Sequence, residues 1–132
     1  MADNIRIEMI RTVLDRLHQS QPADYDSPLL IVTGRTQKLV WQHAIRMVHI
    51  DYRNENSVFD RRVLLMSISE LRGALSKFYE PYIFIVDDTP KGVDRESTLQ
   101  LLKQLDPAKG HRVFMCREAL PGLENLSRPK LH

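Results

Sequence analysis

The segment Tyr82–Asp88 (YIFIVDD) constrains the fold more than any other part of the sequence. Five apolar and aromatic β-forming residues are followed directly by two carboxylates, Asp87 and Asp88. A continuous apolar run of this length is typical of a central strand in a parallel sheet, where helices cover both faces. Open α/β sheets bind their ligands at the carboxyl ends of such strands. The segment therefore predicts a central strand that ends in two carboxylates at a candidate ligand site.

Two interpretations of these carboxylates remain open from the strand alone. In phosphate-handling proteins, one carboxylate at this place holds Mg²⁺, directly or through water, and a second orients the attacking water. Asp87 would then be a metal ligand, and Asp87 with Asp88 would be the catalytic pair of a nucleotide hydrolase. In the other interpretation, the two residues only open a turn or cap the next helix, and the chain has neither a catalytic residue nor a metal site.

Strands and helices alternate along the rest of the chain. The apolar patterns predict strands over residues 29–33, 62–66, 82–86 and 111–116, and helices over 4–20, 39–52, 67–79 and from Asp94 or Ser97 to about residue 105. The spacing of Ser67 and Glu70 is that of a helix capping box. Alternation of this kind predicts a three-layer α/β fold, with a mostly parallel sheet of about four to five strands and right-handed crossovers.

The length of 132 residues fits a single domain. We divide it into an N-terminal helix (1–20), a core (29–116) and an irregular C-terminal tail (117–132). The single cysteine, Cys116, excludes an internal disulfide and a cysteine-rich zinc site, and it is expected in the core. The sequence contains no apolar run long enough to cross a membrane and no signal-peptide pattern, which predicts a cytoplasmic location.

Four segments, in their order along the chain, resemble the AAA+ branch of the P-loop nucleotidases. They are LLIVTGRTQKLVWQHAI (29–45), RVLLMSISELRGAL (62–75), YIFIVDD (82–88) and RVFMCREALPGLENLSRPKL (112–131). They resemble, in turn, the Walker A strand, loop and helix, the second strand, the Walker B strand in its Asp-Asp form, and the sensor 1 strand with the loop toward an arginine finger. The likeness is greatest to bacterial replication initiators, helicase loaders and related transposition ATPases, and it implies a P-loop core.

The nucleotide-binding loop departs from that family's pattern. A P-loop needs two glycines for close approach to phosphate, a lysine for the β- and γ-phosphates and a Ser or Thr for Mg²⁺. Gly34 and Lys38 stand where the first glycine and the lysine belong, and they are the predicted phosphate-binding residues if a nucleotide binds. Gln37 replaces the second glycine, and Leu39 replaces the Ser or Thr. The loop is also about two residues short, and no helical lid follows the core.

The resemblance and its departures together predict a non-catalytic, AAA+-like accessory, adaptor or inhibitor protein without a cofactor. Its partner would be an AAA+ replication or recombination factor, in DNA replication or mobile-element biology. The predicted partner surface comprises Arg117, Arg128 as a remnant of the arginine finger, Lys130, and Trp41 at the edge of its helix.

Two alternatives are kept. One is a minimal ATPase that uses Mg-ATP. The other is a nucleic-acid-binding accessory or clamp-loader-type subunit, which the mildly basic balance (net charge +2, pI about 8.8) permits without requiring it.

Overall fold

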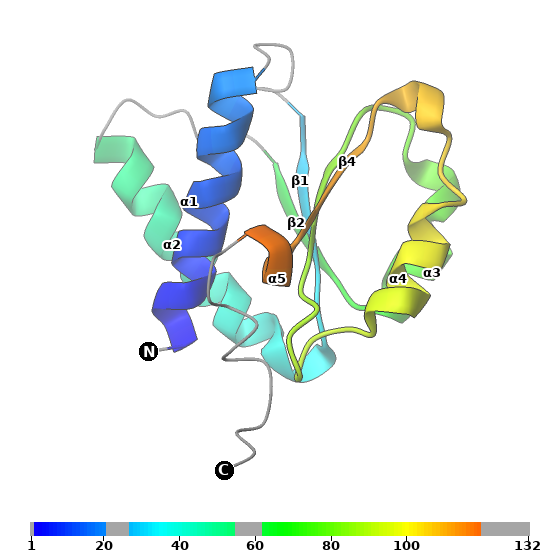
Figure 1. Cartoon of the computed structure of the whole chain (residues 1–132). Helices are drawn as coiled ribbons and strands as arrows, with labels where there is room; N and C mark the ends of the chain where they lie inside the picture. Colours follow the sequence, from blue (N-terminus) through cyan, green and yellow to red (C-terminus); the bar gives the residue numbers. More distant parts are fainter. Residues whose placement is uncertain (1, 21–26, 55–61, 120–132) are drawn as a thin grey trace.

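A computed structural model describes residues 2–20, 27–54 and 62–119 of the chain (Figure 1). The helices are α1 (Ala2–Ser20), α2 (Lys38–Asn54), α3 (Ile68–Ala74), α4 (Arg95–Leu102) and α5 (Cys116–Ala119). The strands are β1 (Leu29–Val32), β2 (Val63–Met66), β3 (Ile83–Val86) and β4 (Arg112–Met115). Short 3₁₀ turns η2 (Arg35–Gln37), η3 (Leu75–Lys77) and η4 (Pro107–Lys109) complete the elements. None of the helices in these ranges is long and apolar enough to cross a membrane.

The four strands form one parallel sheet in the order β2-β1-β3-β4. The chain moves from β1 to β2 in one direction and then back past β1 to β3 and β4 in the other. Because parallel crossovers are right-handed, this reversal sends α2 to one face of the sheet and α3 and α4 to the other. Figure 1 shows this arrangement, with α1 beside α2. The predicted three-layer α/β fold is confirmed.

Each face of the sheet carries its own apolar core. One core joins α1 and α2 to the sheet through Met9, Ile10, Val13, Leu14, Leu29, Ile31, Trp41, Ala44, Val48, Ile83, Ile85 and Cys116. The other joins α3 and α4 to it through Leu30, Val32, Leu71, Phe78, Tyr82, Phe84, Val86, Leu101, Leu102 and Met115. Every residue of β1 and β3 is buried, which explains why both strands are continuously apolar in the sequence.

Two helix starts follow the capping residues seen in the sequence. At α3, the Ser67 hydroxyl accepts from the Glu70 N–H, and the Glu70 carboxylate accepts from the Ser67 N–H, so the capping box is confirmed. At α4, the Asp94 carboxylate accepts from the Ser97 N–H at 2.9 Å. Helix α3 is shorter than predicted, because it changes to a 3₁₀ turn at Leu75 and this turn ends at Lys77.

The structure differs from the prediction at the fourth strand and at the start of the tail. The strand ends at Met115, one residue before its predicted end, and Cys116 begins the short helix α5. The N–H of Arg117 in this helix donates to the carboxylate of Asp88, which follows β3, and this bond stabilises the helical turn at its first residues. The predicted irregular tail thus begins with a helical turn. Arg128 and Lys130 lie outside the described residues.

Candidate functional site

The register of the sheet brings four strand ends to one level. Val32 pairs with both Met66 and Val86, and Val86 pairs with Met115. The residues that follow them, including Thr33 after β1 and Asp87 after β3, therefore share the carboxyl edge of the sheet. The connections after β1 and β3 leave toward opposite faces, which is where open α/β sheets place their ligands.

Asp87 is buried, with 1% of its surface exposed, and all of its acceptor capacity is used by the chain. Its Oδ2 accepts from the Thr33 hydroxyl at 2.7 Å and from the Trp41 indole N–H at 2.8 Å. Its Oδ1 accepts from the Thr89 N–H at 3.3 Å and from the Thr89 hydroxyl at 2.5 Å. A carboxylate has about four lone-pair sites. Asp87 can therefore take a metal ion only by giving up one of these bonds.

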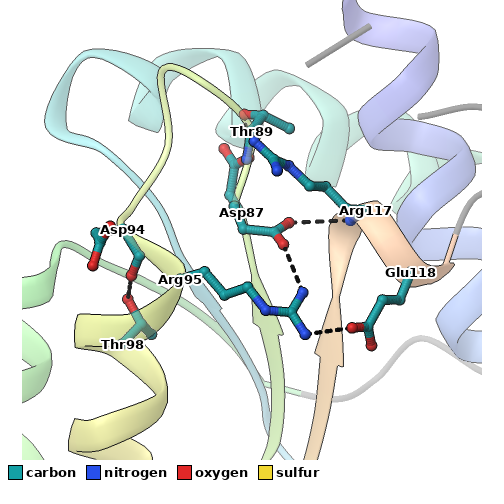
Figure 2. Close-up of polar contacts among 8 residues, drawn as sticks. Asp87, Thr89, Asp94, Arg95, Thr98, Arg117 and Glu118 are labelled. Atoms are coloured by element: carbon teal, nitrogen blue, oxygen red, sulfur yellow. Dashed lines mark hydrogen bonds and ion pairs between the residues drawn. The ribbon is translucent and has the colours of Figure 1, made fainter. Parts of the chain in front are cut away.

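Asp88 is also buried, and it accepts two bonds from other parts of the chain. It is 3% exposed, and its Oδ1 accepts from the N–H of Arg117 at 3.0 Å. Its Oδ2 accepts from the guanidinium of Arg95 at 3.4 Å, and the same guanidinium pairs with Glu118. Figure 2 shows Arg95 extending from the start of α4 toward Glu118 on α5. Asp88 and Arg95 thus fasten α4 and α5 to the end of β3.

The connections after β1 and β3 are packed against each other. A Cβ added to Gly34 would lie 2.4 Å from the carbonyl oxygen of Lys91 and 2.9 Å from that of Gly92. A Cβ added to Gly92 would lie 1.8 Å from the carbonyl oxygen of Asp87. Gly92 closes a turn by donating its N–H to the carbonyl of Thr89. Gly34 therefore accommodates backbone of the chain itself at the place where the sequence analysis predicts phosphate.

The residues before α2 do not form a wide loop. Thr33 and Gly34 are followed at once by η2, and the N–H of Gln37 donates to the carbonyl of Gly34 at 3.0 Å. The Gln37 side chain accepts from the guanidinium of Arg6 on α1 at 2.6 Å. Arg6 also lies over the Trp41 ring, 5.7 Å from its centroid. The P-loop core that the resemblance implies is not confirmed by this geometry.

Lys38 forms an ion pair with Glu70. Strands β1 and β2 are neighbours, so the start of α2 lies beside the start of α3, where Glu70 also completes the capping box. The bond from Lys38, followed by those from Ser67, lowers the pKa of Glu70 from 4.5 to about 2. The predicted phosphate-binding lysine therefore already has a carboxylate partner.

Trp41 and Cys116 belong to the core. Trp41 is 1% exposed, so its predicted place on a partner surface is wrong: its ring fills the space between α2 and the sheet, and its N–H is bound to Asp87. Burial, followed by the nearby charges of Asp87 and Asp88, raises the pKa of the Cys116 thiol well above its usual value. A thiol in this state is a structural residue and not a nucleophile.

The structure brings Gly34, Lys38, Asp87, Asp88 and Arg117 to the same edge of the sheet, as partners of other residues of the chain. Four residues that bond with the two carboxylates, or with the guanidinium beside them, are not predicted as site residues from the sequence: Thr33, Thr89, Arg95 and Glu118. Thr33 directly follows β1, and Thr89 directly follows Asp88. These positions are the one signal in the sequence that could have indicated the two threonines. Within the described ranges, no group of three or more His, Cys, Asp or Glu side chains is arranged to hold a metal ion.

Comparison with known proteins adds no assignment to this geometry. No family model matches the sequence, and no curated protein or solved structure matches the chain.

Proposed function

We propose that this chain is a non-catalytic α/β protein that acts through protein–protein contacts, as an accessory, adaptor or inhibitor. One observation carries the proposal: Asp87, at the place where a nucleotide hydrolase keeps its magnesium carboxylate, accepts four bonds from the chain itself. A hydrolase needs free lone pairs on this carboxylate to hold Mg²⁺ or its water. In this chain the same carboxylate joins β1, β3 and α2 instead.

The contacts of Lys38 and Gly34 support the same proposal. A phosphate group bound by Lys38 would have to share the lysine ammonium with the Glu70 carboxylate, and the two negative charges would repel each other. It would also have to displace the backbone of Lys91, whose carbonyl oxygen lies against Gly34. Both contacts stabilise the fold, so nucleotide binding would work against folding at this edge.

The biological setting of the proposal comes from the sequence resemblance. AAA+ modules associate side by side, and a related chain without a working nucleotide site could dock on such an assembly. We therefore propose an AAA+ replication or recombination factor as the partner, in DNA replication or mobile-element biology and in the cytoplasm.

The decisive experiment is a calorimetric titration of the purified chain with ATP and Mg²⁺, together with a phosphate-release assay. We expect no saturable heat at millimolar ATP and no release above the buffer rate. Saturable binding with turnover that Lys38→Ala abolishes would establish the ATPase alternative instead. Lys103→Ala is the matched control, because Lys103 is an exposed lysine at the end of α4 on the other face of the sheet.

A second experiment tests the contact itself. The chain is mixed with purified AAA+ replication and recombination factors from the same organism, and co-elution and the ATP turnover of each factor are measured. Co-elution with one factor, and a change in its turnover, is the expected result. If the chain instead binds DNA oligonucleotides with an affinity that falls steeply with salt, and none of the factors, the nucleic-acid alternative replaces the proposal.

A further inference from the structure

The outer face of α2 is exposed over about two turns. Leu39, Gln42, His43, Arg46 and Met47 are all exposed, and they recur at the spacing of one helix face. The opposite face of the helix is buried against the sheet and α1. We call these five residues, with Arg35 in the preceding turn, the α2 outer face.

Two large apolar side chains on this face are exposed to solvent. Leu39 is 77% exposed and Met47 is 38% exposed, and they are separated by about 12 Å along the helix axis. The other large apolar side chains exposed in the described ranges are Tyr79, after η3, and Val113, on β4. Each of those stands alone on its element, whereas Leu39 and Met47 share a helix face.

The charge of the α2 outer face is entirely positive. Arg35 and Arg46 are exposed, and neither takes part in a hydrogen bond or ion pair with the described residues. No Asp or Glu occurs from Ser27 to Ile50, and the acidic residue that α2 carries, Asp51, follows Arg46 by five residues. The positive charge of Lys38 is already balanced by Glu70. Arg35 lies four residues before Leu39, and Arg46 directly precedes Met47, so each apolar side chain has one of the two arginines near it on this face.

We propose that the α2 outer face binds an acidic amphipathic helix of a partner protein. A helix of this kind presents apolar residues at intervals of three and four, which can pack on Leu39 and Met47, and carboxylates on either side, which can pair with Arg35 and Arg46. This inference rests on the proposed function, because it names the surface and the partner chemistry for a protein that acts by contact. The contact is one helix long, so its affinity belongs to the weak, transient class.

The same observations favour a protein over a nucleic acid. A surface that follows a phosphate backbone needs several cations in a row, because affinity grows with each phosphate that is neutralised. The α2 outer face offers two guanidiniums that have no ion-pair partner among the described residues, about 16 Å apart along the helix, and a highly exposed leucine between them. Exposed apolar side chains with cations beside them fit a protein interface, whose apolar contacts are bordered by polar and charged groups.

The test is an NMR titration of the full ¹⁵N-labelled chain with a designed helical peptide. The peptide carries a stripe of leucines at intervals of three and four, with glutamates on both sides. One control peptide has lysines in place of the glutamates, and a second has serines in place of the leucines. We expect the acidic peptide alone to shift amide signals, and we expect these signals to belong to α2.

Three variants sharpen the test. Leu39→Ser and Arg46→Glu should each weaken binding of the acidic peptide about tenfold, and Arg46→Glu should also reduce the preference over the lysine peptide. Lys103→Glu makes the same charge reversal on α4 and should leave binding unchanged. All three side chains are exposed, so each variant should fold like the parent chain, which circular dichroism verifies.

The assignment is overturned if the acidic peptide shifts no α2 signal at millimolar concentration, if the lysine peptide binds equally well, or if the shifts map to another element. Binding of a DNA oligonucleotide on α2 without binding of the acidic peptide would replace the assignment, as would self-association of the chain through α2. The ATP titration on the same sample separates this result from the proposed function. ATP turnover would refute the proposed function. If neither ATP nor the acidic peptide binds, only the proposal that α2 binds an acidic helix is refuted.

Discussion

The substitution Asp87→Asn tests whether this carboxylate is a structural group. Each carboxylate oxygen of Asp87 accepts two bonds, but an amide has only one oxygen. The NH₂ group of the new asparagine would therefore face two donors and could not accept from either. Whichever way the amide turns, either the Trp41 indole N–H or the Thr89 backbone N–H loses its acceptor. A buried donor without an acceptor costs about 1–3 kcal/mol, and each remaining bond to the lost charge weakens by about 1 kcal/mol. The neutral amide is easier to bury than a carboxylate, which offsets part of the loss.

The expected net loss is therefore about 2–4 kcal/mol in the free energy of unfolding. With an m value of about 2 kcal/mol per M, the urea midpoint should fall by about 1–2 M. Trp41 is the only tryptophan and is bound to Asp87, so its fluorescence reports on this edge while circular dichroism reports on the helices. Asp94→Asn is the control, because Asn caps a helix as well as Asp and the midpoint should stay unchanged. A stable Asp87→Asn variant, above all one that gains stability while the parent chain binds ATP, would refute the structural role.

The remaining predictions concern close packing and pH. Gly34→Ala should destabilise the fold by about 1–3 kcal/mol, because the new Cβ would meet the Lys91 carbonyl oxygen. Gly73→Ala on α3 is the control, because nothing lies within 4 Å of its new Cβ. In the same urea assay it should be neutral or stabilising by about 0.5 kcal/mol. The pKa of Glu70 is lowered to about 2 in the folded chain. The ionised carboxylate therefore contributes its whole share to the free energy of unfolding above pH 4.5, and this share is lost as the pH falls toward 2. The side chains of Lys38 and Glu70 are 30% and 50% exposed, so solvent screening reduces this contribution to about 1 kcal/mol. The variant Glu70→Gln should lack this pH-dependent loss of stability in acid titrations followed by circular dichroism. Burial lowers the pKa of His111 below 6.5, so the unfolded chain binds the proton first and stability should fall as the pH drops below 6.5. The variant His111→Asn keeps an acceptor for the Tyr82 N–H and should flatten that part of a urea-midpoint profile.

The fold follows closely from local signals in the sequence. The apolar runs at Leu29–Val32 and Ile83–Val86 predict central strands because no residue of either strand faces water. The capping box at Ser67 and Glu70 and the cap at Asp94 lie within a few residues of the helix starts that they fix. Such features need no knowledge of which strands are neighbours.

The roles of the polar residues could not be derived in the same way. Asp87 bonds with Thr33 and Trp41, which lie 54 and 46 residues away, and Asp88 bonds with Arg117, which lies 29 residues away. These contacts exist because β1 is placed beside β3 and β3 beside β4, and the strand order is not written in any local pattern. The prediction that two carboxylates follow a central strand is confirmed. Their hydrogen bonds with Thr33, Trp41 and Arg117 depend on which strands are neighbours, so they could not be predicted from the sequence.

Lys38 shows the same dependence on strand order. In the sequence it has the place of a phosphate-binding lysine, and Glu70 is recognisable only as a capping residue. Pairing of β1 with β2 brings the two side chains together across 32 residues. Arg117 likewise was predicted on a partner surface, and its backbone N–H contributes to the anchoring of α5.

The close approach of Gly34 and Gly92 to neighbouring backbone has a consequence for protein engineering. Carbonyl oxygens, unlike side chains, cannot be removed by substitution, so a point mutation at Lys91 or Gly92 leaves the carbonyl oxygen that lies against Gly34 in the chain. A designer who wished to install a nucleotide site would have to insert residues between Thr33 and Lys38, so that this connection arches away from the turn at Thr89–Gly92.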